Sequence, residues 1–303
     1  MSIDELRTLI ERHAGHGTTT AIDGVLVSRV IESTPPAASM SGTILAIVAQ
    51  GTKRLAIGDR VLEYRAGQYL VASVDLPVTG HFIEASPAEP ALGFGMVLRP
   101  SVVASLLLEH PVNHRGGARG ELAAAGIAVS DAPIELIDAA TRMLRLLDHP
   151  RDAPVLAPLI EREILWRLIT GEQGATVRQL GLAGSNLSRI SHTIAWLREH
   201  HAEAIRIEDL ADMAGMSVSA FHRSFRAVAS MSPIQFQKQM RLREARLRLV
   251  THPNDVAGAG YAVGYDSPSQ FSREYRRQFG VPPGKDAALL RQSPRFDAQP
   301  AIP

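Results

Sequence analysis

The sequence predicts an α+β protein with more than one domain: an N-terminal antiparallel β-sandwich or small barrel with flanking helices, then an all-α C-terminal domain. Its 303 residues are enough for two or three domains. Between residues 18 and 98, short runs of Val, Ile, Leu, Thr and Tyr are interrupted every eight to twelve residues by Gly, Pro or Asp. This spacing is typical of antiparallel strands and tight turns. After Asn186 the pattern consists of short helices without a strand signal.

The composition limits the kinds of chemistry that the chain can perform. It contains no cysteine, which excludes disulfides, thiol nucleophiles, zinc fingers and iron–sulfur clusters. The content of 45% hydrophobic and 21% charged residues is that of a globular protein. The N-terminal segment alternates charged and apolar residues, unlike a signal peptide, and no apolar stretch is long enough to span a bilayer. We therefore expect a cytoplasmic protein with no membrane partner.

The elements can be assigned in order along the chain. Residues 2–14 have the periodicity of an amphipathic helix. Strands are expected at 42–50, 53–57, 61–64, 68–74, 77–84 and 91–98, and helices at 101–109, 133–148 and 158–170. The Gly-rich residues 171–184 indicate a joint between domains. The expected domains are residues 1–99, which are β-rich; residues 100–185, a helical segment; and residues 186–303, which are helical.

The apolar stripe of the 158–170 helix has two interpretations. Leu159, Ile160, Ile164, Leu165 and Leu168 share one face of this helix, and Trp166 lies beside them. The stripe can form the contact surface of a homodimer, or it can pack against the β-domain of the same chain. The sequence does not decide between these two.

The C-terminal third contains one local pattern twice. In the first copy a short helix at 208–214 is followed by Gly215, Ser217 and a second helix at 218–227. In the second copy, residues 256–263 are followed by Gly264, Ser267 and a helix at 268–279. Each copy then carries Phe and Arg two residues apart. A glycine for the tight turn and a serine to cap the next helix are typical of a helix-turn-helix.

Charge and spacing fit a polyanionic partner for this region. Residues 195–303 carry a net charge of +4, whereas residues 1–194 carry −3. A helix at 233–250 connects the two copies and is about 27 Å long at the helical rise. Two recognition helices held by such a connector can enter successive major grooves, roughly 34 Å apart on double-stranded DNA.

The residues that carry a family resemblance lie in the same region. Residues 264–283 read GYDSPSQFSREYRRQFGVPP, and the copy at 210–225 and the connector residues 241–246 match the same pattern. Residues 186–292 thus resemble AraC/XylS-type transcription regulators. The segments QGTKR at 50–54, GQYLV at 67–71 and DLPV at 75–78 resemble the cupin-like regulatory domain of one branch of that family.

Two features depart from the family pattern. Gly258 and Gly260 lie inside the first helix of the second copy, where each costs about 1 kcal/mol relative to alanine. Gly284, Lys285 and Asp286 stand where the family usually has a Tyr-Arg pair. These departures predict a looser second motif that contributes more to affinity than to specificity.

The resemblance implies a sequence-specific DNA-binding regulator that senses a small molecule. It implies two sets of DNA-contacting side chains on the recognition helices, and a solvated helix face is the alternative for each arginine. Base edges would be contacted by Ser219, His222 and Arg223 in the first motif and by Ser269, Gln270 and Arg273 in the second. Phosphates would be contacted by Ser217, Ser267, Arg226, Arg276 and Arg277.

The candidate effector pocket lies in the β-domain. Its candidate residues are Tyr69, His81, Phe94 and Met96, for each of which packing in the core is the alternative. A metal-binding cupin needs several converging histidines, and the strand region offers only His81, so we expect neither a metal nor another cofactor. The expected partners are DNA, a small-molecule effector, RNA polymerase and a second copy of the chain. The alternative is a metal-independent cupin-type enzyme with a C-terminal helical interaction module.

Overall fold

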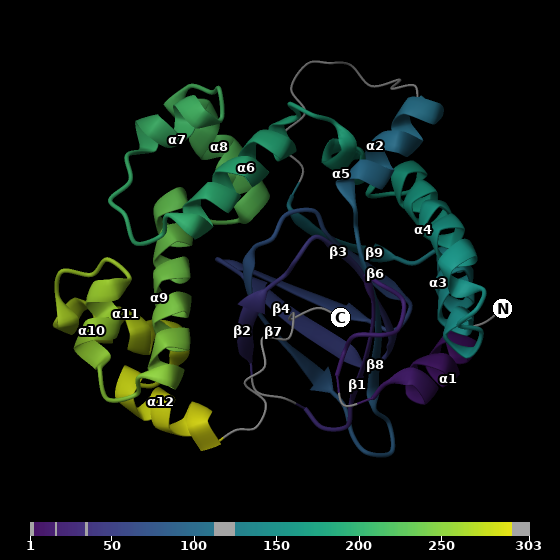
Figure 1. Cartoon of the computed structure of the whole chain (residues 1–303), viewed down its shortest axis with the longest axis horizontal. Helices are drawn as coiled ribbons and strands as arrows, with labels where there is room; N and C mark the ends of the chain where they lie inside the picture. The colour runs from purple at the N-terminus through teal and green to yellow at the C-terminus, as the bar shows by residue number, and fades with distance from the viewer. Residues whose placement is uncertain (1–2, 16, 34–35, 112–124, 293–303) are drawn as a thin grey trace. The chain divides into compact units, whose positions relative to one another are not determined.

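The computed structural model describes residues 3–15, 17–33, 36–111 and 125–292. The chain divides into two compact units, with the boundary close to Ser188 (Figure 1). The first unit contains the strands and the helices that precede this boundary, and the second contains the remaining helices. Within the described residues, no helix is both long enough and apolar enough to span a bilayer.

Two antiparallel sheets form the centre of the first unit. One has five strands in the order β1-β8-β3-β6-β9, and the other has four strands in the order β2-β7-β4-β5. The strands are β1 (Val25–Val30), β2 (Ala37–Met40), β3 (Ile44–Gln50), β4 (Thr52–Ile57), β5 (Arg60–Arg65), β6 (Gln68–Ala72), β7 (Pro77–Glu84), β8 (Ala91–Val97) and β9 (Ile127–Asp131).

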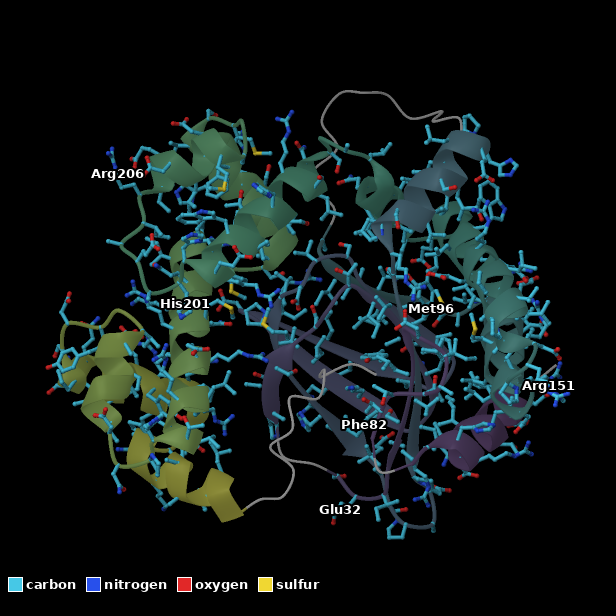
Figure 2. All side chains as sticks on the ribbon, viewed as in Figure 1. Glu32, Phe82, Met96, Arg151, His201 and Arg206 are labelled. Atoms are coloured by element: carbon cyan, nitrogen blue, oxygen red, sulfur yellow. The ribbon has the colours of Figure 1, made fainter. Side chains whose placement is uncertain are left out.

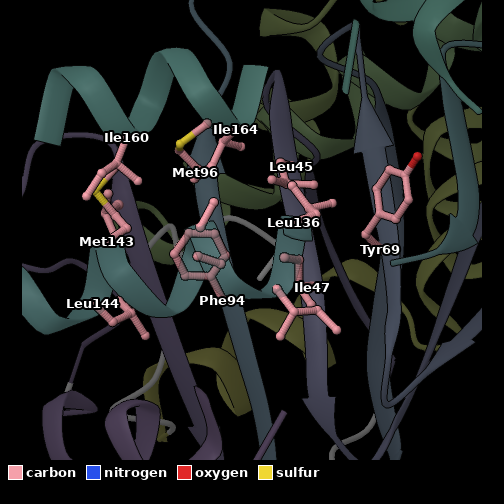
Figure 3. Packing of buried hydrophobic residues seen from close by; sticks show 14 of the residues in the cluster. Leu45, Ile47, Tyr69, Phe94, Met96, Leu136, Met143, Leu144, Ile160 and Ile164 are labelled. Carbon is pink, nitrogen blue, oxygen red and sulfur yellow. The ribbon is translucent and has the colours of Figure 1, made fainter. Parts of the chain in front are cut away.

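A helical layer covers one face of the five-stranded sheet. Its elements are α1 (Ile3–His13), α2 (Pro100–Glu109), α3 (Ile134–Arg145), the short 3-10 helix η1 (Leu146–Asp148), α4 (Ala153–Thr170) and α5 (Gly174–Gly181). Figure 3 shows Leu136 and Met143 of α3 and Ile160 of α4 above Ile47 and Phe94 of the sheet. These buried side chains belong to one continuous hydrophobic core.

The pairing register shows which side chains point away from the helical layer. Adjacent residues of a strand point to opposite faces, and β3 is buried along both of its faces. In the four-stranded sheet, Lys53 pairs with Tyr64 on one side and with Phe82 on the other, and all three are buried. The Lys53 ammonium lies 4.7 Å from the centroid of the Phe82 ring, and only 3% of Lys53 is exposed. The inner face of this sheet therefore holds a buried amino group.

The second unit is helical. Its helices are α6 (Asn186–Glu199), α7 (Ile207–Met213), α8 (Val218–Ala229), α9 (Pro233–Thr251), α10 (Val256–Ala262), α11 (Pro268–Phe279) and α12 (Pro283–Gln292). The long helix α9 begins with a complete capping box: Ser232 caps the backbone N–H of Gln235, and the Gln235 side chain accepts from the backbone N–H of Ser232. The fold class predicted from the sequence, a β-rich N-terminal domain and a helical C-terminal domain with a long connector, is confirmed.

Two elements differ from the sequence expectation for residues 100–185. Strand β9 lies in this segment and extends the five-stranded sheet by pairing with β6. Residues 171–184, expected to be a joint, contain helix α5. Gly181 of α5 approaches α2 so closely that a Cβ atom would lie 2.7 Å from the Ala104 backbone nitrogen. The glycine here permits close helix packing.

One arginine of α9 binds backbone from two separate segments. The Arg241 guanidinium donates to the carbonyl oxygens of His201, Ala202 and Glu203, which lie between α6 and α7, at 2.7, 3.2 and 2.9 Å. It also donates to the Gly264 carbonyl oxygen, between α10 and α11, at 2.7 Å. Gln237, one turn earlier on α9, donates to the same His201 and Glu203 oxygens at 3.0 and 2.7 Å. The connector is thereby fixed to both halves of the unit.

We expect the stability of the first unit to rise with pH because of Lys53. Burial lowers its pKa from 10.5 to about 7, so between these pH values the unfolded chain holds a proton that the folded chain has released. The free energy of unfolding should rise through this window, by about 5 kcal/mol in total, and this contribution is lost as the pH falls to 7. Urea unfolding at several pH values, followed by Trp166 fluorescence in a Trp196→Phe background, measures this rise in the free energy of unfolding.

The Lys53→Met variant should lack this rise, because it has no titrating group at that position. Lys285 is exposed and lies in the second unit, so Lys285→Met is the matched control and should keep the rise. The same pH slope in the native chain and in Lys53→Met would show that other groups produce it.

We expect Arg241→Lys to destabilise the second unit by about 2–3 kcal/mol, because an ammonium cannot reproduce the planar fork that serves four carbonyl oxygens. Urea unfolding followed by far-ultraviolet circular dichroism measures the loss. Arg248→Lys on the same helix is the control: Arg248 is exposed and pairs with Glu244, so the loss of stability should stay within about 0.5 kcal/mol. Equal losses for the two variants would contradict a special role for Arg241.

Candidate nucleic-acid interface

The first helix-turn-helix consists of α7, a four-residue turn and α8. Gly215 adopts a φ of 62°, which glycine tolerates without strain, and Arg189 donates to its carbonyl oxygen at 3.3 Å. The Ser217 hydroxyl caps α8 by accepting from the Ala220 N–H at 3.3 Å. Phe221 and Phe225 are fully buried on one face of α8. The opposite face exposes the side chains of Ser219, His222, Arg223 and Arg226.

The second helix-turn-helix repeats this arrangement with α10 and α11. Gly264 has a φ of 85°, and the Ser267 hydroxyl accepts from the Gln270 N–H at 3.3 Å. Phe271 and Tyr275 are fully buried on the inner face of α11. The outer face exposes Ser269, Gln270, Arg273, Arg276 and Arg277, while Ser267 is half-buried.

The charges on these two outer faces are not neutralised. The guanidinium groups of Arg223, Arg226, Arg273, Arg276 and Arg277 form no ion pair or hydrogen bond with any residue that the structure describes. The other arginines of the second unit with described side chains all have partners; examples are Arg241, Arg246 and Arg248. Because an unpaired guanidinium retains its full capacity to bind phosphate or a base edge, the two helices present the surface best suited to a polyanion.

The two departures from the family pattern have structural explanations. Gly260 lies against the Phe271 ring, where a Cβ atom would sit 3.0 Å from a ring carbon, so glycine lets α10 approach α11. Asp286 is buried and accepts hydrogen bonds from the Tyr275 hydroxyl at 2.7 Å and from Arg246 Nε at 2.8 Å. This network ties α9, α11 and α12 together. The glycine and the aspartate thus serve close packing within the second motif.

The four candidate effector residues do not form one site. Tyr69 and Phe94 are 2% and 0% exposed in the core beneath α3 and α4 (Figure 3). His81 pairs with Arg54 on the outer face of the four-stranded sheet, opposite to the side occupied by Phe82. Burial, reinforced by the charge of Arg54, lowers the pKa of His81. Met96 and Phe82, labelled in Figure 2, lie on different sheets.

Met96 lines a cavity of about 290 Å³, and the other three candidates are not among the residues that line this cavity. The other lining residues come from β1, α3, η1 and α4 and from the segments next to them, and they include Arg99 and Glu161. Sequence analysis did not identify these two residues, which are 62 positions apart and carry no local motif. Within the described part of the chain, no three His, Asp or Glu side chains converge as a metal site requires.

Comparisons with known families cover most of the chain. Residues 21–176, just over half of the chain, match the AraC-type transcriptional regulator N-terminus family, and residues 210–288 match a helix-turn-helix domain family. The HTH-type transcriptional activator RhaS of Escherichia fergusonii is 34% identical over 108 residues, which are 34% of this chain and 38% of that protein. RhaS of Citrobacter koseri is 30% identical over 112 residues, 35% of this chain and 40% of that protein. The chain thus spans about two fifths of the length of these curated relatives.

Solved structures with the same fold include ToxT from Vibrio cholerae. An apo ToxT variant covers 90% of this chain and 100% of its own, with a TM-score of 0.52 at 9% identity. ToxT with a bound unsaturated fatty acid covers 89% of this chain and 96% of its own, with a TM-score of 0.51 at 10% identity. At these identities the likeness establishes the fold alone. Since the N-terminal family model matches more than half of its residues, the chain belongs to the AraC-type transcriptional regulators.

Proposed function

We propose that the protein is a sequence-specific DNA-binding transcription regulator whose N-terminal domain senses a small molecule. The observation that carries this proposal is the set of five unpaired arginines on the outer faces of α8 and α11, four of which occupy corresponding places in the two helix-turn-helix motifs. A polyanion satisfies these charges, and a helix with such a face fits the major groove. Double-stranded DNA is therefore the proposed partner.

The exposed side chains divide into two roles. In the first motif, Ser219, His222 and Arg223 occupy the N-terminal turns of α8, which enter the groove in this motif, and would contact base edges. Arg226 lies further along the helix and would contact phosphate, as would the O–H of Ser217, which remains able to donate. In the second motif, base edges would be contacted by Ser269, Gln270 and Arg273, and phosphates by Ser267, Arg276 and Arg277.

The proposed function divides the chain into three segments. Residues 1–99 would form the sensor, residues 100–185 the dimerisation or linker segment, and residues 186–303 the DNA-binding domain, with the cytoplasm as the place of action. Binding of a small molecule changes DNA binding, or contact with RNA polymerase, by the difference in its affinity for two arrangements of the protein. The enzyme alternative gives no reason for two motifs with matching caps and unpaired arginines, and the named relatives are transcriptional activators.

Dimerisation through α4 is supported by a second apolar face on this helix. Ile160, Ile164, Leu165 and Leu168 pack in the core of the same chain. Leu159 does not: it is 60% exposed, and it lies beside Val155 and Leu156, which are 68% and 40% exposed. Three large apolar side chains on one exposed helical face favour contact with another apolar surface, and we assign them to a homodimer.

We expect selection of the full-length protein on a random duplex library at moderate salt to enrich two short sequence blocks about one helical turn apart. On the selected site, Arg223→Ala should weaken binding by about 1–3 kcal/mol and relax the preference at one base position, because a bidentate contact to guanine is lost. Arg226→Ala should weaken binding to all sequences alike and lower the salt slope by about one.

Arg248→Ala is the matched control for these variants, because Arg248 lies on α9 and is paired with Glu244. It should leave both the affinity and the salt slope unchanged. Purely salt-sensitive binding with no enriched sequence would contradict the proposed function. A uniform loss for Arg223→Ala on every sequence would instead make Arg223 a phosphate contact.

We expect Leu159→Glu to convert the dimer to a monomer, because it places a charge in an apolar contact. Sedimentation at matched protein concentration measures the change. Leu108→Glu on α2 is the control, since Leu108 is 83% exposed and lies outside the α4 face, and it should remain dimeric. Identical sedimentation of the two variants would exclude α4 as the dimer contact.

A further inference from the structure

The cavity of about 290 Å³ in the first unit lies between the five-stranded sheet and the helical layer. Its sheet side is formed by Val25 of β1 and Met96 of β8, and its helical side by Met143 of α3, Leu146 of η1 and Ala157 of α4. Its volume is near the lower end of the range of about 300–1,000 Å³ that is typical of small-molecule sites. Apolar side chains on both walls suit an apolar ligand.

A polar cluster stands among these apolar walls. Arg99, which precedes α2, donates to Glu161 Oε2 of α4 at 2.7 Å and to Asp23 Oδ2 at 2.7 Å. All three residues line the cavity. One cation faces two carboxylates, so the cluster carries a net charge of −1 at neutral pH.

One oxygen of this cluster has no hydrogen-bond donor. Glu161 is 8% exposed, and its Oε1 is buried and receives no hydrogen bond from the described residues, whereas its Oε2 binds Arg99. Buried polar atoms are nearly always hydrogen-bonded, because an unsatisfied one costs about 1–3 kcal/mol and more when it is charged. A donor brought by a ligand removes this cost.

We propose that this cavity binds a small molecule with an apolar body and a primary ammonium group, which donates to Glu161 Oε1. An ammonium supplies several donors and neutralises the net charge of the cluster. The Asp23 side chain is 97% exposed, but a carboxylate of the same size still meets the buried Glu161 and gains no donor beyond the already paired Arg99. The cavity therefore selects amines over acids.

The position of the cavity links its occupancy to regulation, a step that rests on the proposed function. A ligand here contacts strands β1 and β8 and also α3 and α4, so it favours the spacing of sheet and helices that it fits best. Helix α4 also carries the exposed face of Val155, Leu156 and Leu159. Binding therefore changes the presentation of this face and, through the dimer, the affinity for DNA.

Calorimetric titration of the full chain with 2-phenylethylamine, tryptamine and hexylamine tests the site. The matched acids, 3-phenylpropionate, indole-3-propionate and heptanoate, serve as controls. At least one amine should bind, and its acid should bind at least about tenfold more weakly. Glu161→Gln removes the charge but preserves the shape, and it should weaken amine binding by about tenfold or more while leaving the weak binding of acids unchanged.

Two further variants separate the site from unspecific effects. Ala21 is exposed and lines the cavity, so Ala21→Trp should block binding without disturbing the core. Glu135→Gln on α3 removes an exposed carboxylate outside the cavity and should bind the amine like the native chain. Failure of all three amines, or equal binding to Glu161→Gln and the native chain, would overturn the proposal.

DNA affinity measured with and without the amine distinguishes this proposal from the proposed function. A change that disappears in Glu161→Gln supports both the site and its regulatory role. Amine binding with unaltered DNA affinity overturns the regulatory role and leaves the site. A chain that binds the amine but selects no DNA sequence overturns the proposed function alone.

Discussion

The second unit depends on the hydrogen bonds of one guanidinium group. Arg241 binds the backbone that leads into α7 and the turn that leads into α11, so the two recognition helices take their positions from one side chain of α9. A planar fork with five N–H donors serves several carbonyl oxygens at once, which no other side chain can do. Together with the apolar core that α9 shares with α10, α11 and α12, this contact holds the two motifs at a set separation.

In the first unit, the alternation of β-strands determines which residues are available to a ligand. Phe94 and Tyr69 point toward the helical layer, while Lys53, Tyr64 and Phe82 occupy the inner face of the other sheet. A shift of one position along a strand exchanges these two environments. The aromatic character of a strand residue therefore does not show whether it lies beneath the helical layer or on the inner face of the four-stranded sheet. The pairing register of the strand is needed to decide this.

Much of the fold and of the proposed DNA-binding surface follows from local sequence. The turn glycines, capping serines and helical periodicity place Ser219 and Arg223 on one outer face and Phe221 and Phe225 on the inner one, and the structure has this arrangement. Strand β9 is only five residues long, and its own sequence does not identify it as a strand; its pairing with β6 in the structure does. The Arg99–Glu161 pair joins residues 62 positions apart. Contacts between residues so far apart in the sequence leave no local pattern, so only the structure could identify them.

The rigidity of α9 has an evolutionary consequence for the genes that such a regulator controls. The helix has 19 residues and is about 28 Å long, without a glycine or an internal proline at which it could bend. One base pair inserted between two contacted blocks turns the second block by roughly 35° around the duplex axis, away from a recognition helix that cannot follow. Under the proposed function, point substitutions in a promoter can therefore accumulate gradually, whereas a single insertion or deletion in its spacer is expected to abolish recognition in one step.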